Sequence, residues 1–324
     1  MDDKKYTLEE KNNEFTLTIN AGIKEIPTDA FKGREDFTLV EIPESVTSIG
    51  ELAFEHCIKL KSVRFTGTPN LTSIGNYAFR WCDSLASVVI PKSVTTIGWS
   101  AFSGCSNLKS VEIPDSVTSI AYYAFDMCSR LESVTFTGTS KLTSIKKATF
   151  EKCSSLKLVE IPDSVTSIGD YVFSGCSSLA SVVIPNSVTS IGWSAFSDCT
   201  SLESVVIPDS VTSISHVAFQ GCSSLESVTI RSTKIWIKGY AFQGAPITNL
   251  KLPSDRREIE INKDAFDAGI LEAATDLGGG SRKRKPTKRK STKRKSAKRK
   301  STKRKSTKRK STKRKSTKRK SAKK

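Results

Sequence analysis

One repeated unit runs through most of the chain and limits the folds open to it. In its cleanest copies the unit reads Ser-Val-Thr-Ser-Ile-Gly-x-x-Ala-Phe-x-x-Cys-x-x-Leu-x-x-Val-x-Ile-Pro, and it recurs from Ile26 to Phe266. A period of 23 to 25 residues separates its phenylalanines: Phe31, Phe54, Phe79, Phe102, Phe125, Phe150, Phe173, Phe196, Phe219, Phe242 and Phe266. A fixed period of this size indicates a solenoid, in which neighbouring repeats share one continuous core.

Residues 179–199 show what one repeat is expected to build. In Leu179–Ile184 the apolar residues alternate inward with the period of a strand. Pro185 ends that strand, because proline cannot donate a hydrogen bond to a neighbouring strand. In Ala195–Cys199 the apolar residues fall at i, i+1 and i+4, which predicts one short helical turn. Each repeat should therefore form one strand, one turn and one helical turn.

The repeat also resembles a known family. Between Ile97 and Pro114 the pattern is carried by Ala101, Phe102, Cys105, Leu108, Val111 and Ile113. It is similar to the BspA-type leucine-rich repeat family over about residues 26–266. The resemblance implies a leucine-rich-repeat superhelix, curved and built on a parallel sheet, that binds proteins or surfaces. Members of the family include adhesins and intracellular proteins.

Composition divides the chain into four parts. We expect an N-terminal cap at 1–25, a solenoid of about 11 repeats at 26–266, a C-terminal cap with a glycine linker at 267–280, and a basic tail at 281–324. Phe15–Ile19 alternates like a covering strand, and Asp267–Leu277 is polar and predicted helical. Thr66–Asn70 and Thr137–Lys141 each lengthen a turn by two residues, so these turns should bulge where the strand ends.

All eight cysteines stand three residues after a repeat phenylalanine: Cys57, Cys82, Cys105, Cys128, Cys153, Cys176, Cys199 and Cys222. One cysteine per repeat at one position is typical of a packing residue, since a free thiol behaves as a small buried apolar group. An even count also permits disulfides in an oxidising compartment. Zinc is disfavoured because the chain has no Cys-x-x-Cys pair and only two histidines.

The strand residues that alternate outward form a candidate binding surface on the expected concave face. A partner that lies across the repeats would contact one such residue in each. Equally, a solvated strand surface tolerates mixed residues of this kind without any partner. The candidate protein-binding residues in the second to ninth repeats are Arg64, Val89, Glu112, Thr135, Glu160, Val183, Val206 and Thr229.

A second candidate surface is aromatic. A row of exposed aromatic side chains suggests a partner surface, although each could instead pack on the adjacent turn with its polar tip in water. Its members beside the repeat phenylalanines are Tyr77, Trp99, Tyr122, Tyr123, Tyr171, Trp193 and Tyr240.

The sequence favours a protein without catalytic activity or cofactor. Its glycines stand mostly alone in the repeat turns, so no phosphate-binding loop or dinucleotide motif can be assembled. The motifs Gly-x-Ser-x-Gly and His-Glu-x-x-His are absent. His56 and His216 occupy non-equivalent positions in distant repeats.

The basic tail differs sharply from the rest. Residues 281–324 contain 27 Lys and Arg and no Asp or Glu, which leaves 25 basic against 33 acidic residues in 1–280. The body therefore carries about −8 and the tail +27. A segment with so few apolar residues cannot offset the entropy of ordering, and we expect it to be disordered.

Dense positive charge is suited to replacing counterions on a polyanion, of which nucleic acid is the most highly charged. Without aromatic residues the tail should contact the phosphate backbone and read no sequence. A Lys/Arg cluster is also typical of a nuclear localisation signal. The alternative is a solubility tail or a low-complexity expansion. The candidate residues are Arg282, Lys283, Arg284, Lys285, Lys288, Arg289, Lys290, Lys293, Arg294, Lys295, Lys298, Arg299, Lys300, Lys303, Arg304 and Lys305.

Two functions fit these observations. The first is an adaptor whose solenoid binds a protein and whose tail binds nucleic acid. The second is an adhesive module whose tail contacts anionic membrane or polysaccharide. The first residues are too polar for a signal peptide, and no apolar stretch approaches the ~18 residues of a spanning helix. We therefore expect a monomer inside the cell, in the nucleus or cytoplasm.

Overall fold

The computed structural model describes residues 5–11 and 14–277. These residues belong to one compact unit. The tail expectations, both its disorder and its candidate binding residues, lie outside the described residues.

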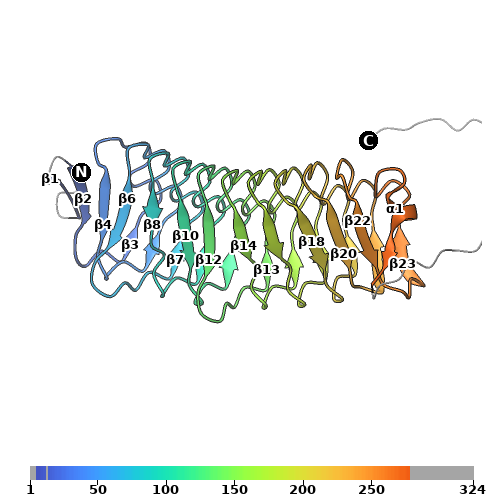
Figure 1. Ribbon diagram of the computed structural model, residues 1–324. Coiled ribbons are helices and arrows are strands. Elements are labelled where there is room, and N and C mark those ends of the chain that lie inside the picture. Colours follow the sequence, from blue (N-terminus) through green and yellow to red (C-terminus); the bar gives the residue numbers. More distant parts are fainter. Residues whose placement is uncertain (1–4, 12–13, 278–324) are drawn as a thin grey trace, which may run out of the picture. The chain divides into compact units, whose positions relative to one another are not determined.

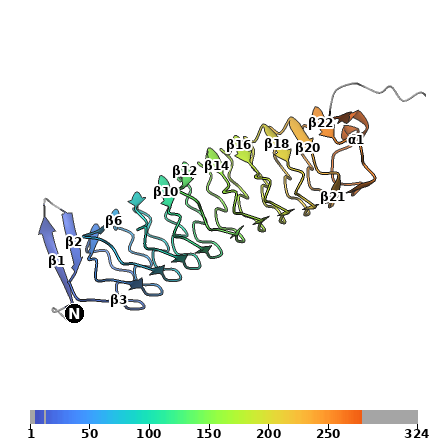
Figure 2. The same ribbon diagram turned by 90° about the horizontal axis from the view of Figure 1, so that it is seen from below.

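The repeats form a parallel β-solenoid of about eleven turns with two strands in most turns (Figures 1 and 2). The first set of strands, at the Leu-x-x-Val-x-Ile part of the unit, comprises β4 (Leu39–Ile42), β6 (Ser62–Phe65), β8 (Ser87–Val88), β10 (Ser110–Ile113), β12 (Ser133–Phe136), β14 (Leu158–Glu160), β16 (Ser181–Val183), β18 (Ser204–Ile207), β20 (Ser227–Ile230) and β22 (Asn249–Leu252). We call the outward side of these strands the strand face.

A second set of mostly two-residue strands was not expected. It lies at the Ser-Ile part of the unit and comprises β3 (Glu25–Ile26), β5 (Ser48–Ile49), β7 (Ser73–Ile74), β9 (Thr96–Ile97), β11 (Ser119–Ile120), β13 (Ser144–Ile145), β15 (Ser167–Ile168), β17 (Ser190–Ile191), β19 (Ser213–Ile214), β21 (Lys234–Ile237) and β23 (Glu258–Ile261). Figure 2 shows the two sets along opposite edges of the solenoid.

Equivalent residues of successive repeats lie side by side. In the pair β10 and β12, for example, Val111 lies opposite Val134 and Glu112 opposite Thr135. This register stacks each position of the unit in a column. The repeat phenylalanines form one such column in the core, with adjacent ring centroids 4.7–5.7 Å apart and ring planes within 21° of parallel. The expected shared core is confirmed.

The expected helical turn at the phenylalanine is wrong. We call the seven residues centred on each repeat phenylalanine the phenylalanine turn. In a helix the N–H of Phe54 would bond four residues back, but it donates to the carbonyl of Ala78 in the next repeat at 2.7 Å. Leu52 and His56, two residues before and after Phe54, have φ of 58° and 57°, which excludes a right-handed helix there.

The cysteine column packs in the core as expected. Each of the eight thiols is fully buried and donates to the carbonyl of the phenylalanine in the preceding repeat, as Cys128 Sγ does to Phe102 O at 3.2 Å. Burial raises the pKa of the Cys57 thiol to about 12, and it raises the pKa of Cys128 as well. These groups are therefore neutral thiols that fill space.

Each end of the solenoid is covered. β1 (Tyr6–Lys11) and β2 (Glu14–Ile19) form an antiparallel hairpin, and β2 pairs with β4, as expected of a covering strand. At the other end the predicted helical segment is mostly wrong. Only α1 (Ile270–Ala273) is helical, because Ala274 turns extended with ψ of 137°, and β24 (Thr275–Asp276) then pairs with β22.

Candidate functional site

The strand face presents the eight predicted residues outward. Seven of them are exposed and Thr229 is half-buried, while their neighbours along the strand, such as Val111 and Val182, are buried. This column contains three valines, which are the residues of the column least expected on a solvated surface because their side chains are apolar. Val89 is 72% exposed, Val183 57% and Val206 43%. This apolar exposure distinguishes the column from an ordinary polar strand surface.

Six of the eight predicted residues line two grooves in the strand face. The first groove, of about 650 Å³, is lined by Arg64, Val89 and Glu112. The second, of about 980 Å³, is lined by Thr135, Glu160 and Val183. The structure therefore gathers these residues in two groups of three consecutive repeats. The remaining two residues, Val206 and Thr229, line neither groove.

Each groove is bounded by one of the two lengthened turns. Gly67 lies in the first and Gly138 in the second, with φ of 69° and 61°, a conformation that glycine adopts without strain. The first turn rests on Glu44 of the preceding repeat, whose Oε2 accepts from Thr68 N at 3.0 Å. A Cβ at Gly67 would lie 2.6 Å from that same oxygen. The predicted bulges are confirmed, and they create the groove walls.

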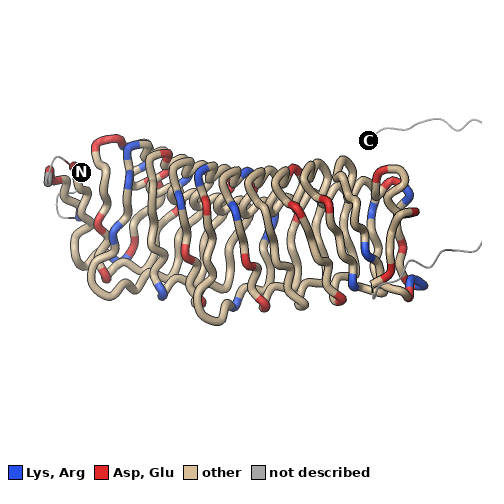
Figure 3. Tube along the Cα trace, viewed as in Figure 1, with Lys and Arg blue, Asp and Glu red and all other residues tan. Residues whose placement is uncertain are grey.

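The two grooves differ in charge. The lining of the first includes Arg64, Lys92 and Glu112. The second includes Glu160 and Asp163 and has no Lys or Arg among its lining residues. Arg64 is bound to Glu41 of the adjacent strand at 2.8 Å, an exposed pair that adds little stability. Both signs of charge occur along the solenoid (Figure 3). The second groove is locally acidic, because its only charged lining residues are Glu160 and Asp163.

The predicted aromatic residues come together on the phenylalanine turns. Tyr77 and Trp99 have ring centroids 6.4 Å apart, and Trp99 and Tyr123 are also 6.4 Å apart. Lys147 lies over the rings of both Tyr123 and Tyr171, at 5.9 and 5.5 Å. Farther along, Trp193 contacts His216 at 6.1 Å. We call the connected run Tyr77, Trp99, Tyr122, Tyr123, Lys147 and Tyr171 the aromatic row.

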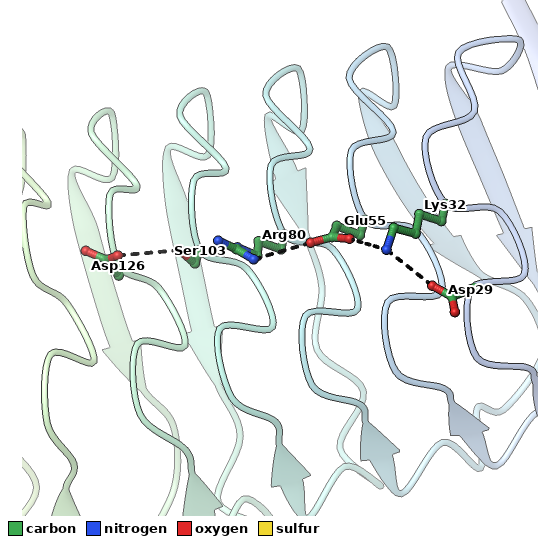
Figure 4. Close-up of polar contacts among 6 residues, drawn as sticks. All are labelled: Asp29, Lys32, Glu55, Arg80, Ser103 and Asp126. Carbon is green, nitrogen blue, oxygen red and sulfur yellow. Dashed lines mark hydrogen bonds and ion pairs between the residues drawn. The ribbon is translucent and has the colours of Figure 1, made fainter.

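A polar column that sequence reasoning missed lies one residue after each repeat phenylalanine (Figure 4). Lys32 Nζ is 3.0 Å from a carboxylate oxygen of Glu55, and Arg80 Nη1 is 3.4 Å from the other. Ser103 donates to Asp126 at 3.5 Å. The sequence does contain a signal for this column, because a polar residue follows the repeat phenylalanine in successive repeats. Parallel register then places the opposite charges of neighbouring repeats side by side. We interpret the column as structural.

Asp126 is the exception in that column. Burial and, to a smaller extent, the carboxylate of Glu151 in the next repeat together raise the pKa of Asp126 to about 6, against smaller opposite effects of Lys152 and of its hydrogen bonds. Burial also raises the pKa of Glu151. Asp126 and Glu151 therefore place two acidic groups in successive repeats, whereas Lys32, Glu55 and Arg80 alternate in charge from one repeat to the next.

The structure does not bring the two histidines together. His56 stacks near Trp81 at 6.4 Å, and His216 lies beside Trp193 seven repeats away. Within residues 5–11 and 14–277, no group of three His, Cys, Asp or Glu side chains is arranged to hold a metal ion. None of the helices in that part of the chain has the length and apolar character needed to cross a membrane.

Comparisons with known proteins agree with this architecture. A family model described as BspA type Leucine rich repeat region (6 copies) matches residues 4–132, 72–203 and 143–270. A solved leucine-rich repeat protein from Bacteroides ovatus is similar over 84% of this chain and 80% of its own, with 26% identity and a TM-score of 0.62. A leucine rich cell surface protein from Faecalibacterium prausnitzii has 24% identity over 86% of this chain and 98% of its own, with a TM-score of 0.39. A search of curated proteins found no match.

Proposed function

The chain belongs to the BspA-type leucine-rich repeat family, and from that premise we propose that it is a non-enzymatic binding scaffold. Its strand face binds an extended segment of a protein partner. Its basic tail binds nucleic acid through the phosphate backbone and directs nuclear entry.

The observation that carries the protein-binding part is the pair of grooves. Each combines a highly exposed valine, Val89 or Val183, with a carboxylate from the adjacent repeat. A small apolar anchor next to a few polar groups is typical of a binding site. The grooves occupy two sets of three repeats, so one extended segment that crosses the strands can fill both. The acidic second groove favours a basic residue in that part of the partner.

Selection from a displayed library of extended peptides, with the full chain as bait, tests the strand face. Peptides recovered on the native chain should bind Val89→Asp and Val183→Asp at least tenfold more weakly, because each substitution replaces the apolar anchor of its groove with an unpaired charge. Val206→Asp is the matched control, since Val206 belongs to the same column and lines neither groove. Equal affinity for all three variants would refute binding in the grooves.

The nucleic-acid part rests on charge. Residues 281–324 carry 27 positive charges and no acidic residue, and neutralising phosphates releases condensed counterions. Arbitrary duplex DNA should bind the full chain with an affinity that falls steeply with salt. Acidic substitutions of Ser291, Ser296, Ser301, Ser306, Ser311, Ser316 and Ser321 should weaken that binding, because added negative charge offsets the lysines and arginines.

Residues 1–280 alone serve as the control, since the solenoid is a compact unit of its own. They should not bind the duplex in the same assay. Duplex binding that persists without the tail would contradict this division of labour.

An adhesive role is the second candidate, because BspA-type repeats are shared with surface proteins and anionic membranes also attract basic clusters. Antibody labelling of intact and permeabilised source cells separates the two. Label on intact cells supports adhesion, and label confined to nuclei of permeabilised cells supports the adaptor.

A further inference from the structure

We propose that the aromatic row binds a single-stranded nucleic acid, whose bases stack on the aromatic rings. This proposal goes beyond the function proposed above, because it assigns a second ligand-binding surface to the solenoid itself. It is argued from the contacts of the row, so it stands or fails independently of the tail.

The row offers flat groups on successive repeats. Tyr77 and Trp99 are nearly parallel, with planes 26° apart, and Trp99 and Tyr123 are 13° apart. Trp99 is 44% exposed and Tyr122 is 46% exposed, although both are large apolar side chains. Nucleobases stack on such platforms whatever their sequence, because every base has a π face.

Lysines continue the row where an aromatic residue is missing. Lys147 occupies the repeat between Tyr123 and Tyr171 and lies over both rings. Lys146 lies over Tyr122 at 5.9 Å, and its Nζ also bonds the hydroxyl of Ser119. The two cations are therefore held at the aromatic surface, and neither takes part in an ion pair of the described residues closer than 4 Å.

Asp170 lies close enough to Lys147 for their charges to interact, and its carboxylate is hydrogen-bonded to the backbone. Asp170 Oδ1 accepts from Trp193 N at 2.7 Å, just as Asn76 Oδ1 accepts from Trp99 N at 2.9 Å. Lys147 keeps its positive charge beside this carboxylate, because its hydrogen bond with Tyr123 and, to a smaller extent, the charge of Asp170 raise its pKa. Proline-rich peptides also dock on aromatic surfaces, but a neutral peptide gains nothing from Lys146 and Lys147. Aromatic stacking combined with backbone neutralisation is the pattern of single-strand binding.

The test measures the affinity of the full chain for labelled single-stranded oligo-dT and oligo-U and for a duplex of equal length. Trp99→Ala combined with Lys147→Ala should lower affinity for both single strands at least tenfold, because one stacked base and one phosphate contact are lost. Affinity for the duplex, which the tail binds, should change less than twofold.

Trp236→Ala is the matched control. Trp236 lies on β21, is 52% exposed and also has a lysine over its ring, Lys238 at 4.9 Å, but it lies outside the row. Its substitution should leave single-strand affinity unchanged. Circular dichroism should show that each variant remains folded.

Two results would overturn the proposal. One is an equal loss, or no loss, of single-strand and duplex affinity in the Trp99/Lys147 variant. The other is quenching of tryptophan fluorescence by a proline-rich peptide but not by either oligonucleotide, which would make the row a peptide surface. Failure of the native chain to bind the duplex would refute the tail proposal and leave this one intact.

Discussion

At the scale of single residues, backbone conformation shapes the phenylalanine turn. Positions two before and two after each repeat phenylalanine from Phe31 to Phe242 adopt positive φ, as Tyr77 and Trp81 do at 57°. The later position is often glycine, as in Gly104 and Gly221, but the earlier one never is. For an L-residue this conformation costs about 1–2 kcal/mol. The strain persists because N–H groups of the turn donate to carbonyls of the next repeat, and carbonyls of the turn accept from N–H groups of the preceding repeat.

Val217 should reveal that strain, because it is β-branched and has φ of 52°. Val217→Asn should raise the free energy of unfolding by about 0.5–1 kcal/mol, since asparagine tolerates the left-handed conformation. Urea denaturation measures the change. Val217→Ala is the control and should bring a smaller gain, because alanine removes the β-branching but keeps the penalty of an L-residue with positive φ. Stabilisation by alanine as great as by asparagine would show that strain is not the cause.

Asp126 should make stability depend on pH. Its pKa is raised to about 6 in the folded protein from an ordinary value of 3.8, so the folded state holds this proton more tightly than the unfolded state. Stability should therefore fall as pH rises from about 4 to about 6 and stay lower above that. Asp126→Asn should stabilise the protein at pH 7 by about 1 kcal/mol, an effect limited by the partial exposure of the group.

The advantage of Asp126→Asn should vanish near pH 4, where the native carboxyl is also neutral. Denaturant melts at pH 4 and pH 7 provide the comparison. The exposed Asp163 is the control site, and Asp163→Asn should change stability little at either pH. A pH-independent effect of Asp126→Asn would show that packing, rather than charge, is responsible.

At the scale of the element, the phenylalanine column joins the repeats. Phe125 stacks between Phe102 at 5.3 Å and Phe150 at 5.5 Å and is fully buried. Phe125→Ala should destabilise by about 3–5 kcal/mol, through lost burial and the cavity left behind. Phe266, at the end of the column, contacts Phe242 and is 6% exposed.

Phe266→Ala should therefore cost less than Phe125→Ala, because fewer contacts are lost and the end of a solenoid can relax or unfold locally. Calorimetry of both variants measures the difference. Equal losses at the two positions would show that the solenoid unfolds only as one indivisible unit.

At the scale of the whole molecule, every repeat contacts its neighbours through nearly the same surface. Residues 98–120 and 192–214 have closely similar sequences at an offset of 94 residues, as do 75–97 and 169–191. Deletion of residues 98–191 joins Ile97 to Gly192 and keeps a native-like contact at the junction. The product should fold, with its strand signal retained and a lower melting temperature because it has four fewer repeats.

Circular dichroism checks that deletion. The control removes residues 98–180, which breaks the repeat phase and should leave an unfolded or aggregated chain. Failure of the in-phase deletion to fold would mean that distant repeats depend on one another.

Sequence by itself determined the solenoid, its period, the buried Phe, Cys and Leu columns and strands such as the one that carries Val183. These follow from the periodic placement of apolar residues, which each repeat must bury. It also located the two lengthened turns, because an insertion of two residues shows directly in the spacing. The outward direction of the eight strand-face residues followed from strand alternation.

The contacts between neighbouring repeats were decided only by the tertiary structure. The N–H of Phe54 bonds to the carbonyl of Ala78 rather than within its own turn, so the predicted helical turn gave way to a non-helical turn with positive φ at Leu52 and His56. The two grooves, the Lys147 contact with two tyrosines and the Asp126–Glu151 repulsion likewise join groups about 24 residues apart or more. Local patterns do not contain these contacts, because they depend on the register in which one repeat stacks on the next.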